Sequence, residues 1–280
     1  MNPIILYKNY LANNTLTVTS EASGYSKDNL IDWRTFTKWK ASSSADQNID
    51  AFVDNDQAYL ELAEGGWLET EGGFLELEDG VAPDALFILN HNLKTIGATI
   101  TIQYSLDAGV SYTTIHSFVP ATNKAQFVIF NLTDIIVSQY WRIKITGATA
   151  AAEIGILMLG KKLQFPWPPD NQVIPKQESM KLASEISQEG HLLGTVLAYN
   201  GIQINHKWSN LLRQWTEGTF EQFWDSHAKF IYPFVYVWDL TNRPDDIFYV
   251  RVNTDMVYQE PLSKLSYADE LQLQMTGISE

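Results

Sequence analysis

The sequence predicts a mainly β protein, with an antiparallel β-sandwich in residues 1–160 and an α+β domain in residues 171–280. Two observations support this prediction. In the first half, short segments rich in β-branched and aromatic side chains recur between clusters of turn-forming residues, a spacing typical of a sandwich or barrel. A proline-rich stretch then precedes a second half in which strand-like runs flank one helical pattern.

Strand character is clearest after residue 85. Turn signals such as Asp107-Ala108-Gly109 and Thr146-Gly147 separate the strand-like segments, as expected where antiparallel strands connect directly. Helices do not alternate with strands here, and no glycine-rich phosphate-binding motif appears, which disfavours a nucleotide-binding α/β fold. The segments are residues 86–89, 99–104, 112–116, 126–131, 140–145 and 154–159.

A boundary between domains is predicted at residues 161–170. Pro166, Pro168 and Pro169 make this stretch a stiff extended linker, because proline fits neither a helix interior nor a central strand. Beyond it, residues 210–229 have the apolar spacing of a helix. The segments with strand character in this half are residues 196–204, 231–238, 248–252, 256–258 and 270–275.

Composition excludes several kinds of site. The chain has no cysteine, so it has no disulfide framework and no thiol nucleophile. Its formal net charge of -14 argues against sequence-specific or general binding to nucleic acid, which requires a basic surface. No apolar run is long enough to span a bilayer, and we expect neither a signal peptide nor a membrane partner.

An acidic repeat interrupts the first half. A unit of aromatic residue, leucine and glutamate begins at Tyr59, Trp67 and Phe74, and residues 64–80 form a Gly/Glu-rich insertion. Such alternation between glycine turns fits short half-buried strands. We favour a solvated hairpin that decorates the sandwich; the alternatives are an acidic interaction ribbon or a calcium site.

Two features of this region bear on function. Asp54 and Asp56 supply oxygen atoms at alternate positions but lack the glycine and distal glutamate of a complete calcium loop, so we expect no metal. In a docking ribbon, Trp67 and Phe74 would reach a partner while Glu69 and Glu76 face its basic groups.

Signatures of catalysis are missing. There is no nucleophile elbow, no paired-histidine zinc motif and no kinase signature. The five histidines are scattered, and a structural role is expected for each. We therefore predict no catalytic residues, no cofactor and no enzyme activity, although abundant carboxylates leave a glycan-cleaving enzyme as a further alternative.

Nine tryptophans offer stacking platforms or buried packing groups. Trp33, Trp39, Trp67 and Trp167 lie near turns or extended segments, where a carbohydrate-binding module would expose them. For Trp39 and Trp141 we favour a core position, because their neighbours are strand-like. The residues expected at interfaces between subunits are Trp67, Phe74, Glu69, Glu76, Trp167, Phe223 and Trp224.

Residues 13–160 resemble a discoidin (coagulation-factor C-type) domain, a jelly-roll β-sandwich. The resemblance begins in the run Ser23-Gly24-Tyr25-Ser26-Lys27-Asp28-Asn29-Leu30-Ile31-Asp32 and in Thr37-Lys38-Trp39. It continues in Gln103-Tyr104-Ser105-Leu106-Asp107-Ala108-Gly109 and Tyr140-Trp141-Arg142-Ile143, and it closes with residues 153–160. The insertion at residues 64–80 departs from the family pattern. The resemblance implies binding of glycans, lipids or proteins through loops at one end.

A second resemblance concerns phage proteins. The acidic repeat resembles low-complexity segments of virion proteins, and residues 220–224, 232–239 and 248–251 are similar in style to tail-tube-like domains of distal tail and minor tail proteins. This implies a structural component of a bacteriophage tail or baseplate, assembled in the host cytoplasm and located in the virion. Its partners would be its own copies, in a threefold or sixfold ring, and other tail proteins. The alternative is a carbohydrate-binding module of a secreted or surface protein.

Overall fold

The computed structural model divides the chain into two compact units. One unit is Lys8–Lys161, and the other combines Met1–Tyr7 with Lys162–Glu280. The structure describes residues 2–12, 14–53, 80–130, 135–170, 177–186, 188–189, 191–253, 263–264 and 267–278. Each unit is built around its own antiparallel sheets, so the chain is mainly β, as predicted.

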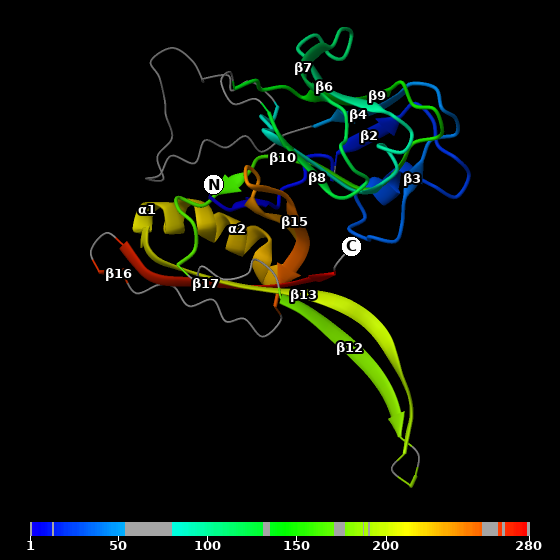
Figure 1. Ribbon diagram of the computed structural model, residues 1–280. Helices are drawn as coiled ribbons and strands as arrows, with labels where there is room; N and C mark the ends of the chain where they lie inside the picture. Colours follow the sequence, from blue (N-terminus) through cyan, green and yellow to red (C-terminus); the bar gives the residue numbers. More distant parts are fainter. Residues whose placement is uncertain are drawn as a thin grey trace. The chain divides into compact units, whose positions relative to one another are not determined.

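The first unit is a two-layer antiparallel sandwich (Figure 1). One sheet has the strand order β2-β4-β9-β6-β7, and the other has the order β3-β10-β5-β8. A short 3-10 helix, η1 (Lys27–Leu30), precedes β3. The strands are β2 (Thr15–Val18), β3 (Trp39–Lys40), β4 (Gln47–Phe52), β5 (Ala85–His91), β6 (Thr99–Ser105), β7 (Thr113–Phe118), β8 (Gln126–Ile129), β9 (Tyr140–Thr146) and β10 (Glu153–Gly160).

Burial along the strands explains why these segments pair as they do. In β4 and β9 buried and half-buried residues alternate, because each strand turns one face to the core. In β10 every residue after Glu153 is buried, as in a strand covered on both faces. Trp39 and Trp141 are 0% and 1% exposed in this core, which confirms the core position expected for both.

The second unit is a curled antiparallel sheet. Its strand order is β11-β1-β14-β15-β17-β13-β12, with β16 paired to β17. In Figure 1, β12 and the first part of β13 form a long two-stranded ribbon. The strands are β1 (Ile4–Leu6), β11 (Leu163–Gln164), β12 (Gln177–Ile186), β13 (Leu192–Leu212), β14 (Phe234–Asp239), β15 (Arg243–Val252), β16 (Ser263–Lys264) and β17 (Tyr267–Ile278).

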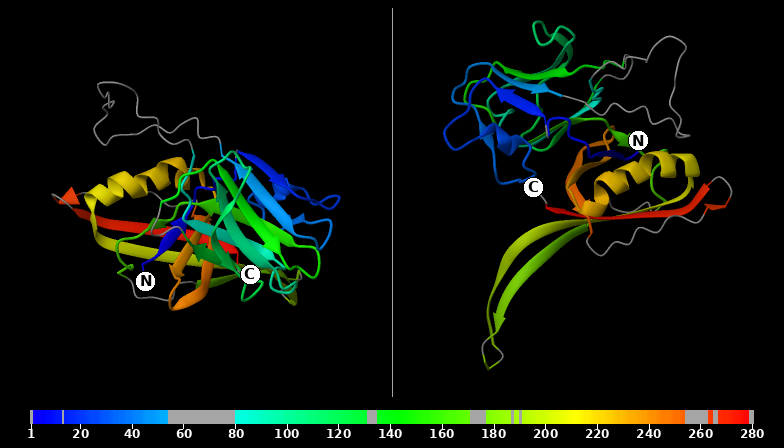
Figure 2. Two further views of the ribbon diagram at one scale, coloured as in Figure 1. Left: turned by 90° about the horizontal axis from the view of Figure 1, so that it is seen from above. Right: turned by 180° about the vertical axis from the view of Figure 1, so that it is seen from behind.

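A helical stretch covers one face of this sheet (Figure 2). It runs through α1 (Arg213–Trp215), a π-helical turn η2 (Thr216–Phe220) and α2 (Glu221–Ser226), and η3 (Ala228–Phe230) follows. This confirms the helix expected from the apolar spacing of residues 210–229. None of the helices in the described parts of the chain has the length and apolar character needed to cross a membrane.

The observed units differ from the expected boundaries at both ends of the sandwich. Residues 1–7 were expected in the sandwich, yet β1 pairs with β11 and β14 in the second unit. Residues 161–170 were expected to form a linker, yet they contain β11, and Leu163 and Phe165 are buried in the core of the second unit. A short apolar run gives no indication of which distant strand it will join, and a proline-rich segment can still lie at a sheet edge.

Candidate functional site

Loops from both sheets meet at one end of the sandwich. Strand β10 begins there, with Glu153 opposite Lys40 of β3 and Ile154 opposite His91, the last residue of β5. The preceding loop, residues 31–38, approaches the same end before β3. Other connections at this end are residues 41–46, 92–98, 119–125 and 147–152.

Internal hydrogen bonds hold the loop of residues 32–37 in a fixed conformation. The Asp32 carboxylate accepts a hydrogen bond from the Arg34 backbone N–H at 2.9 Å and one from the Thr37 hydroxyl at 2.8 Å. Within the loop, the Phe36 side chain is 79% exposed. The turn therefore presents an aromatic ring to solvent on a loop held by internal hydrogen bonds.

Asn90 ties this loop to the sandwich. Its side-chain amide donates to the Thr35 carbonyl at 2.7 Å, and its backbone has a φ of 54°, which is uncommon for a residue other than glycine. Gly155 lies opposite, where a Cβ atom would come within 3.0 Å of the Asn90 Cβ. An unusual backbone conformation at the end of β5 thus positions the loop.

Replacing Asn90 with valine should destabilise the sandwich more than replacing it with glycine. Both variants lose the hydrogen bond to Thr35, but only valine forces a β-branched residue into the left-handed region. We expect the Asn90→Val variant to lose about 1–2 kcal/mol more in its free energy of unfolding than Asn90→Gly. Urea denaturation of both variants measures this difference, and equal losses would contradict the role assigned to the Asn90 backbone.

Charged side chains surround Glu153 beside this loop. Lys40 Nζ lies 2.8 Å from one carboxylate oxygen, and Lys38 Nζ lies 3.7 Å from the other. The Lys40 ammonium also lies 5.7 Å from the centroid of the Tyr25 ring, within cation-π range. The hydrogen bond from Lys40 lowers the pKa of Glu153 and raises the pKa of Lys40, so both groups are charged at neutral pH. All three charged side chains are partly exposed, so a ligand can reach them.

His91 has a structural role at this end. Its Nδ1 accepts from the Leu93 backbone N–H, so Nε2 carries the proton and donates to the Lys124 carbonyl at 2.9 Å. The ring is 5% exposed, and burial lowers its pKa. A neutral histidine with both nitrogens paired connects two of the loops and is not a free base.

The second unit contains a separate surface depression. It is open and shallow, has a volume of about 510 Å³, and is lined by Trp167, Asp170, Ser209 and Asn210. Trp167 is the residue of this group that the sequence suggested as a stacking platform or interface residue. Its partly buried ring packs against the core of the second unit.

The other interface candidates have different positions. Phe223 is fully buried in the core of its own unit, with its ring 5.0 Å from Phe234 and 5.1 Å from Tyr7, so it has no surface to offer a second subunit. Trp224 is partly buried against the same core. Asp54, Asp56, Trp67, Glu69, Phe74 and Glu76 lie outside the described residues.

Metal binding was not expected from the sequence. In the ranges that the structure describes, no three histidine, aspartate or glutamate side chains lie in a group suited to a metal ion. The absence of a metal stays a prediction, because Asp54 and Asp56 are not among those residues. Sequence analysis missed Phe36, whose exposure depends on the turn closed by Asp32.

The solved structures that resemble part of this chain include carbohydrate-binding modules. Chitosan-binding module 1 of a chitosanase/glucanase from Paenibacillus sp. IK-5 is 16% identical, with a TM-score of 0.39 over 55% of this chain and 98% of the module. Module CBM32-5 from Clostridium perfringens, in complex with GalNAc-β-1,3-galactose, is 13% identical, with a TM-score of 0.38 over 54% of this chain and 96% of the module. A pectin-binding module is 13% identical, with a TM-score of 0.37 over 55% of this chain and 91% of the module. No protein-family model and no curated protein matches the chain.

These comparisons correct the main functional expectation. We expected a bacteriophage tail or baseplate component, but the similar structures are carbohydrate-binding modules and none of those described above is a tail protein. The alternative kept from the sequence, a carbohydrate-binding module, agrees better with them. The tail component was inferred from the mixture of aromatic and charged residues in the second half. Such a mixture occurs in many unrelated folds, so it does not identify a tail protein. Self-association stays a prediction.

Proposed function

We propose that the sandwich of residues 8–161 is a carbohydrate-binding module that acts through the end formed by Phe36, Glu153 and their neighbours. The exposed ring of Phe36 is the observation that supports this proposal most directly. An aromatic side chain that is 79% exposed on an internally bonded loop contributes little to the core of its own domain. Its face is available to the C–H groups of a sugar ring.

Polar groups at the same end of the sandwich provide hydrogen bonds for sugar hydroxyls. Lys38 and Lys40 donate, and Glu153 accepts, at an edge where each keeps part of its side chain exposed. A hydrogen bond between a charged side chain and a neutral hydroxyl is stronger than a hydrogen bond between two neutral groups. Asp32 and Asn90 already fix the loop. Binding of a sugar therefore orders few additional groups, and the entropic cost of binding is small.

We further propose that this end binds without cleaving the glycan. A glycosidase needs two carboxyl groups across the scissile bond, one of them a general acid with a raised pKa. At this end the hydrogen bond from Lys40 lowers the pKa of Glu153, and the Asp32 carboxylate accepts hydrogen bonds from the Arg34 backbone N–H and the Thr37 hydroxyl. Glu153 therefore lacks the raised pKa of a general acid, and the Asp32 carboxylate is engaged in holding the loop.

Substitution of Phe36 by alanine tests the proposal. We expect the full-length protein to be retained by at least one of three insoluble polysaccharides, namely chitin, cellulose and cross-linked galactomannan. Phe36→Ala should weaken that retention about tenfold or more, the scale of losing one central aromatic contact. Depletion of the protein from solution measures the affinity.

The matched control is Phe230→Ala. Phe230 is an exposed phenylalanine, at 55%, in the second unit, so its replacement removes an exposed ring without changing the sandwich. Its retention should equal that of the unchanged protein. Retention by none of the three polysaccharides, or equal retention of Phe36→Ala and the unchanged protein, would refute the proposed function.

A further inference from the structure

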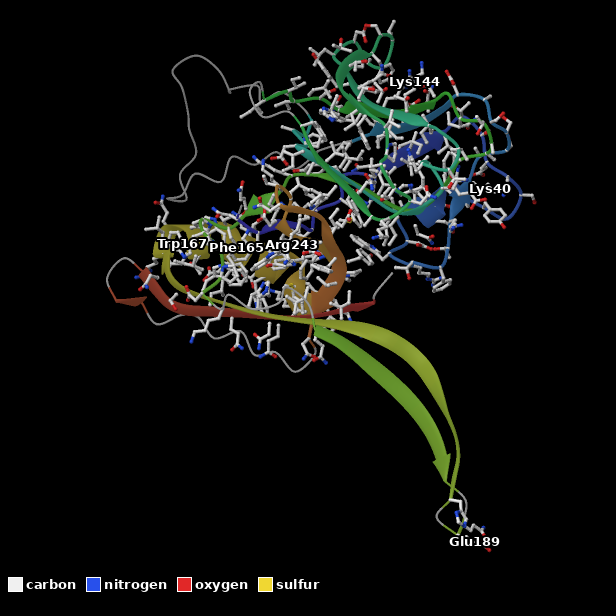
Figure 3. All side chains as sticks on the ribbon, in the orientation of Figure 1. Lys40, Lys144, Phe165, Trp167, Glu189 and Arg243 are labelled. Atoms are coloured by element: carbon white, nitrogen blue, oxygen red, sulfur yellow. The ribbon has the colours of Figure 1, made fainter. Side chains whose placement is uncertain are left out.

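The depression in the second unit brings together one indole ring and three polar side chains. Trp167 and Asp170 lie in residues 165–170, the segment after β11 that we call the strap, and Ser209 and Asn210 lie in β13. Figure 3 labels Trp167 beside Phe165, at the side of this unit away from the tip of the ribbon at Glu189. The depression has a volume of about 510 Å³ and is open to solvent, so a ligand bound there would keep one face exposed.

Two hydrogen bonds of its backbone fix the strap against β13. The Trp167 carbonyl accepts from Trp208 Nε1 at 3.2 Å, and the Asp170 N–H donates to the Lys207 carbonyl at 2.8 Å. The Phe165 ring stacks on Trp208 with centroids 4.1 Å apart and planes 9° apart. The backbones that carry the indole and the carboxylate are therefore held against β13.

Prolines restrict the same segment further. Trp167 lies between two proline residues, and a third follows, so the φ angles of its neighbours are fixed and its own backbone is confined to extended conformations. A ligand would therefore meet a preformed indole surface and would not have to order the strap. The prolines are Pro166, Pro168 and Pro169.

Asn210 marks a change in the direction of β13. Its φ is 58°, in the left-handed region that favours glycine and is tolerated by asparagine. Before it, Trp208 is buried, and after it the buried residue is Leu211, so the period of two is interrupted at Asn210. The interruption leaves Asn210 exposed beside half-buried Ser209, at the edge of the depression.

We propose that this depression is a second saccharide site, which binds a neutral pyranose independently of the sandwich. The Trp167 indole would stack against the apolar face of the sugar ring, and the Asp170 carboxylate would accept hydrogen bonds from two neighbouring hydroxyl groups. Ser209 and Asn210 each have groups that donate and accept. No side-chain hydrogen bond or ion pair in the described parts of the chain engages Asp170, Ser209 or Asn210.

Charge defines the class of sugar. Among the described residues that line the depression, Asp170 is the one with a formal charge, and the whole chain carries a formal net charge of -14. A uronic acid or a sulfated sugar would be repelled at short range and would cost free energy to desolvate. A neutral hexose or N-acetylhexosamine avoids this repulsion.

Indole N–H resonances test the proposal in the full-length Phe36→Ala variant, in which the proposed sandwich site is disabled. The probes are the methyl glycosides of glucose, galactose, mannose and N-acetylglucosamine at millimolar concentration, with glucuronate as the anionic comparison. The Trp167 resonance is assigned by its loss in Trp167→Phe. At least one neutral glycoside should shift it in a saturable way, and glucuronate should not.

Three variants make the test specific. Asp170→Asn should weaken binding about tenfold, while Tyr232→Ala, which replaces an exposed aromatic residue of the same unit, should leave it unchanged. Trp167→Ala should remove binding, which is followed in this variant by the backbone amide resonances of Ser209 and Asn210. Asp170 is exposed, so Asp170→Asn keeps the test valid even where Trp167→Ala perturbs folding. Three results would each overturn the second site. The first is no shift with any neutral glycoside, and the second is equal affinity in Asp170→Asn. The third is a Trp167→Ala variant that changes only the oligomeric state, measured by sedimentation velocity.

Discussion

Replacing Trp141 with alanine is expected to lower the free energy of unfolding of the sandwich by about 3–5 kcal/mol, the range for removing a buried tryptophan. The side chain is 1% exposed, and its indole N–H donates to the Ser138 carbonyl at 2.8 Å. Its ring also contacts Tyr104 and Phe130. Alanine would leave a cavity and remove one of the two hydrogen bonds that the Ser138 carbonyl accepts, since the bond from the Val81 N–H remains.

Urea denaturation followed by circular dichroism measures this loss, and Phe36→Ala is the control. Phe36 is exposed, so its replacement should change the unfolding free energy by no more than about 0.5 kcal/mol. The two units are expected to unfold in separate transitions, and only the transition of the sandwich should move in Trp141→Ala. A loss below about 1 kcal/mol would show that the core closes around the smaller residue.

The second unit should lose about 3 kcal/mol of stability as the pH falls from 6.5 to 4, because of His206. This side chain is 1% exposed, its Nδ1 lies 2.6 Å from the Tyr236 hydroxyl, and Nε2 has no hydrogen-bond partner in the described structure. Burial among the rings of Tyr236, Trp208 and Trp238 lowers the pKa of His206 from 6.5 to about 4.

The sign follows from proton binding. Below pH 6.5 the unfolded chain binds a proton at His206 and the folded chain does not, so protonation favours unfolding until the folded pKa near 4 is reached. His227 contributes in the same direction, since burial also lowers its pKa. His206→Gln should therefore reduce the pH dependence of unfolding between pH 6.5 and 4, even if it is less stable at pH 7. Parallel curves for the two proteins would show that His206 is not the group responsible.

The periodic part of the fold could be predicted, because it depends on local pattern. All six strand-like segments between residues 86 and 159 correspond to strands β5 to β10. The helix over residues 213–226 was predicted for the same reason. Strand β2 was missed because only Leu16 of its four residues is buried, which leaves too little apolar pattern to detect.

Long-range pairing and exposure could not be predicted in the same way. Sequence suggested Trp33 as a stacking platform, but the exposed ring in that loop is Phe36. The turn that exposes it depends on Asp32 and on Asn90, which lies far away in the chain. Trp167 was proposed from its proline-rich surroundings, while its neighbours Ser209 and Asn210 come from a strand about forty residues later, a juxtaposition that spacing does not encode.

The pairing of β1 with β11 and β14 also sets an order of folding. During synthesis the whole sandwich emerges between β1 and the rest of its sheet, so the sandwich can complete itself while Ile4–Leu6 still has no partner. In the finished sandwich the Tyr10 N–H donates to the Leu159 carbonyl at 2.8 Å, so the chain segments that lead to β1 and β11 are already held together. Before the sandwich forms, the same pairing would require closing a loop of more than 150 residues, so the second unit is expected to form after the sandwich. Refolding experiments should show a fast phase from the sandwich and a slower phase from the second unit, and a fragment of residues 162–280 would lack the strand that separates β11 from β14.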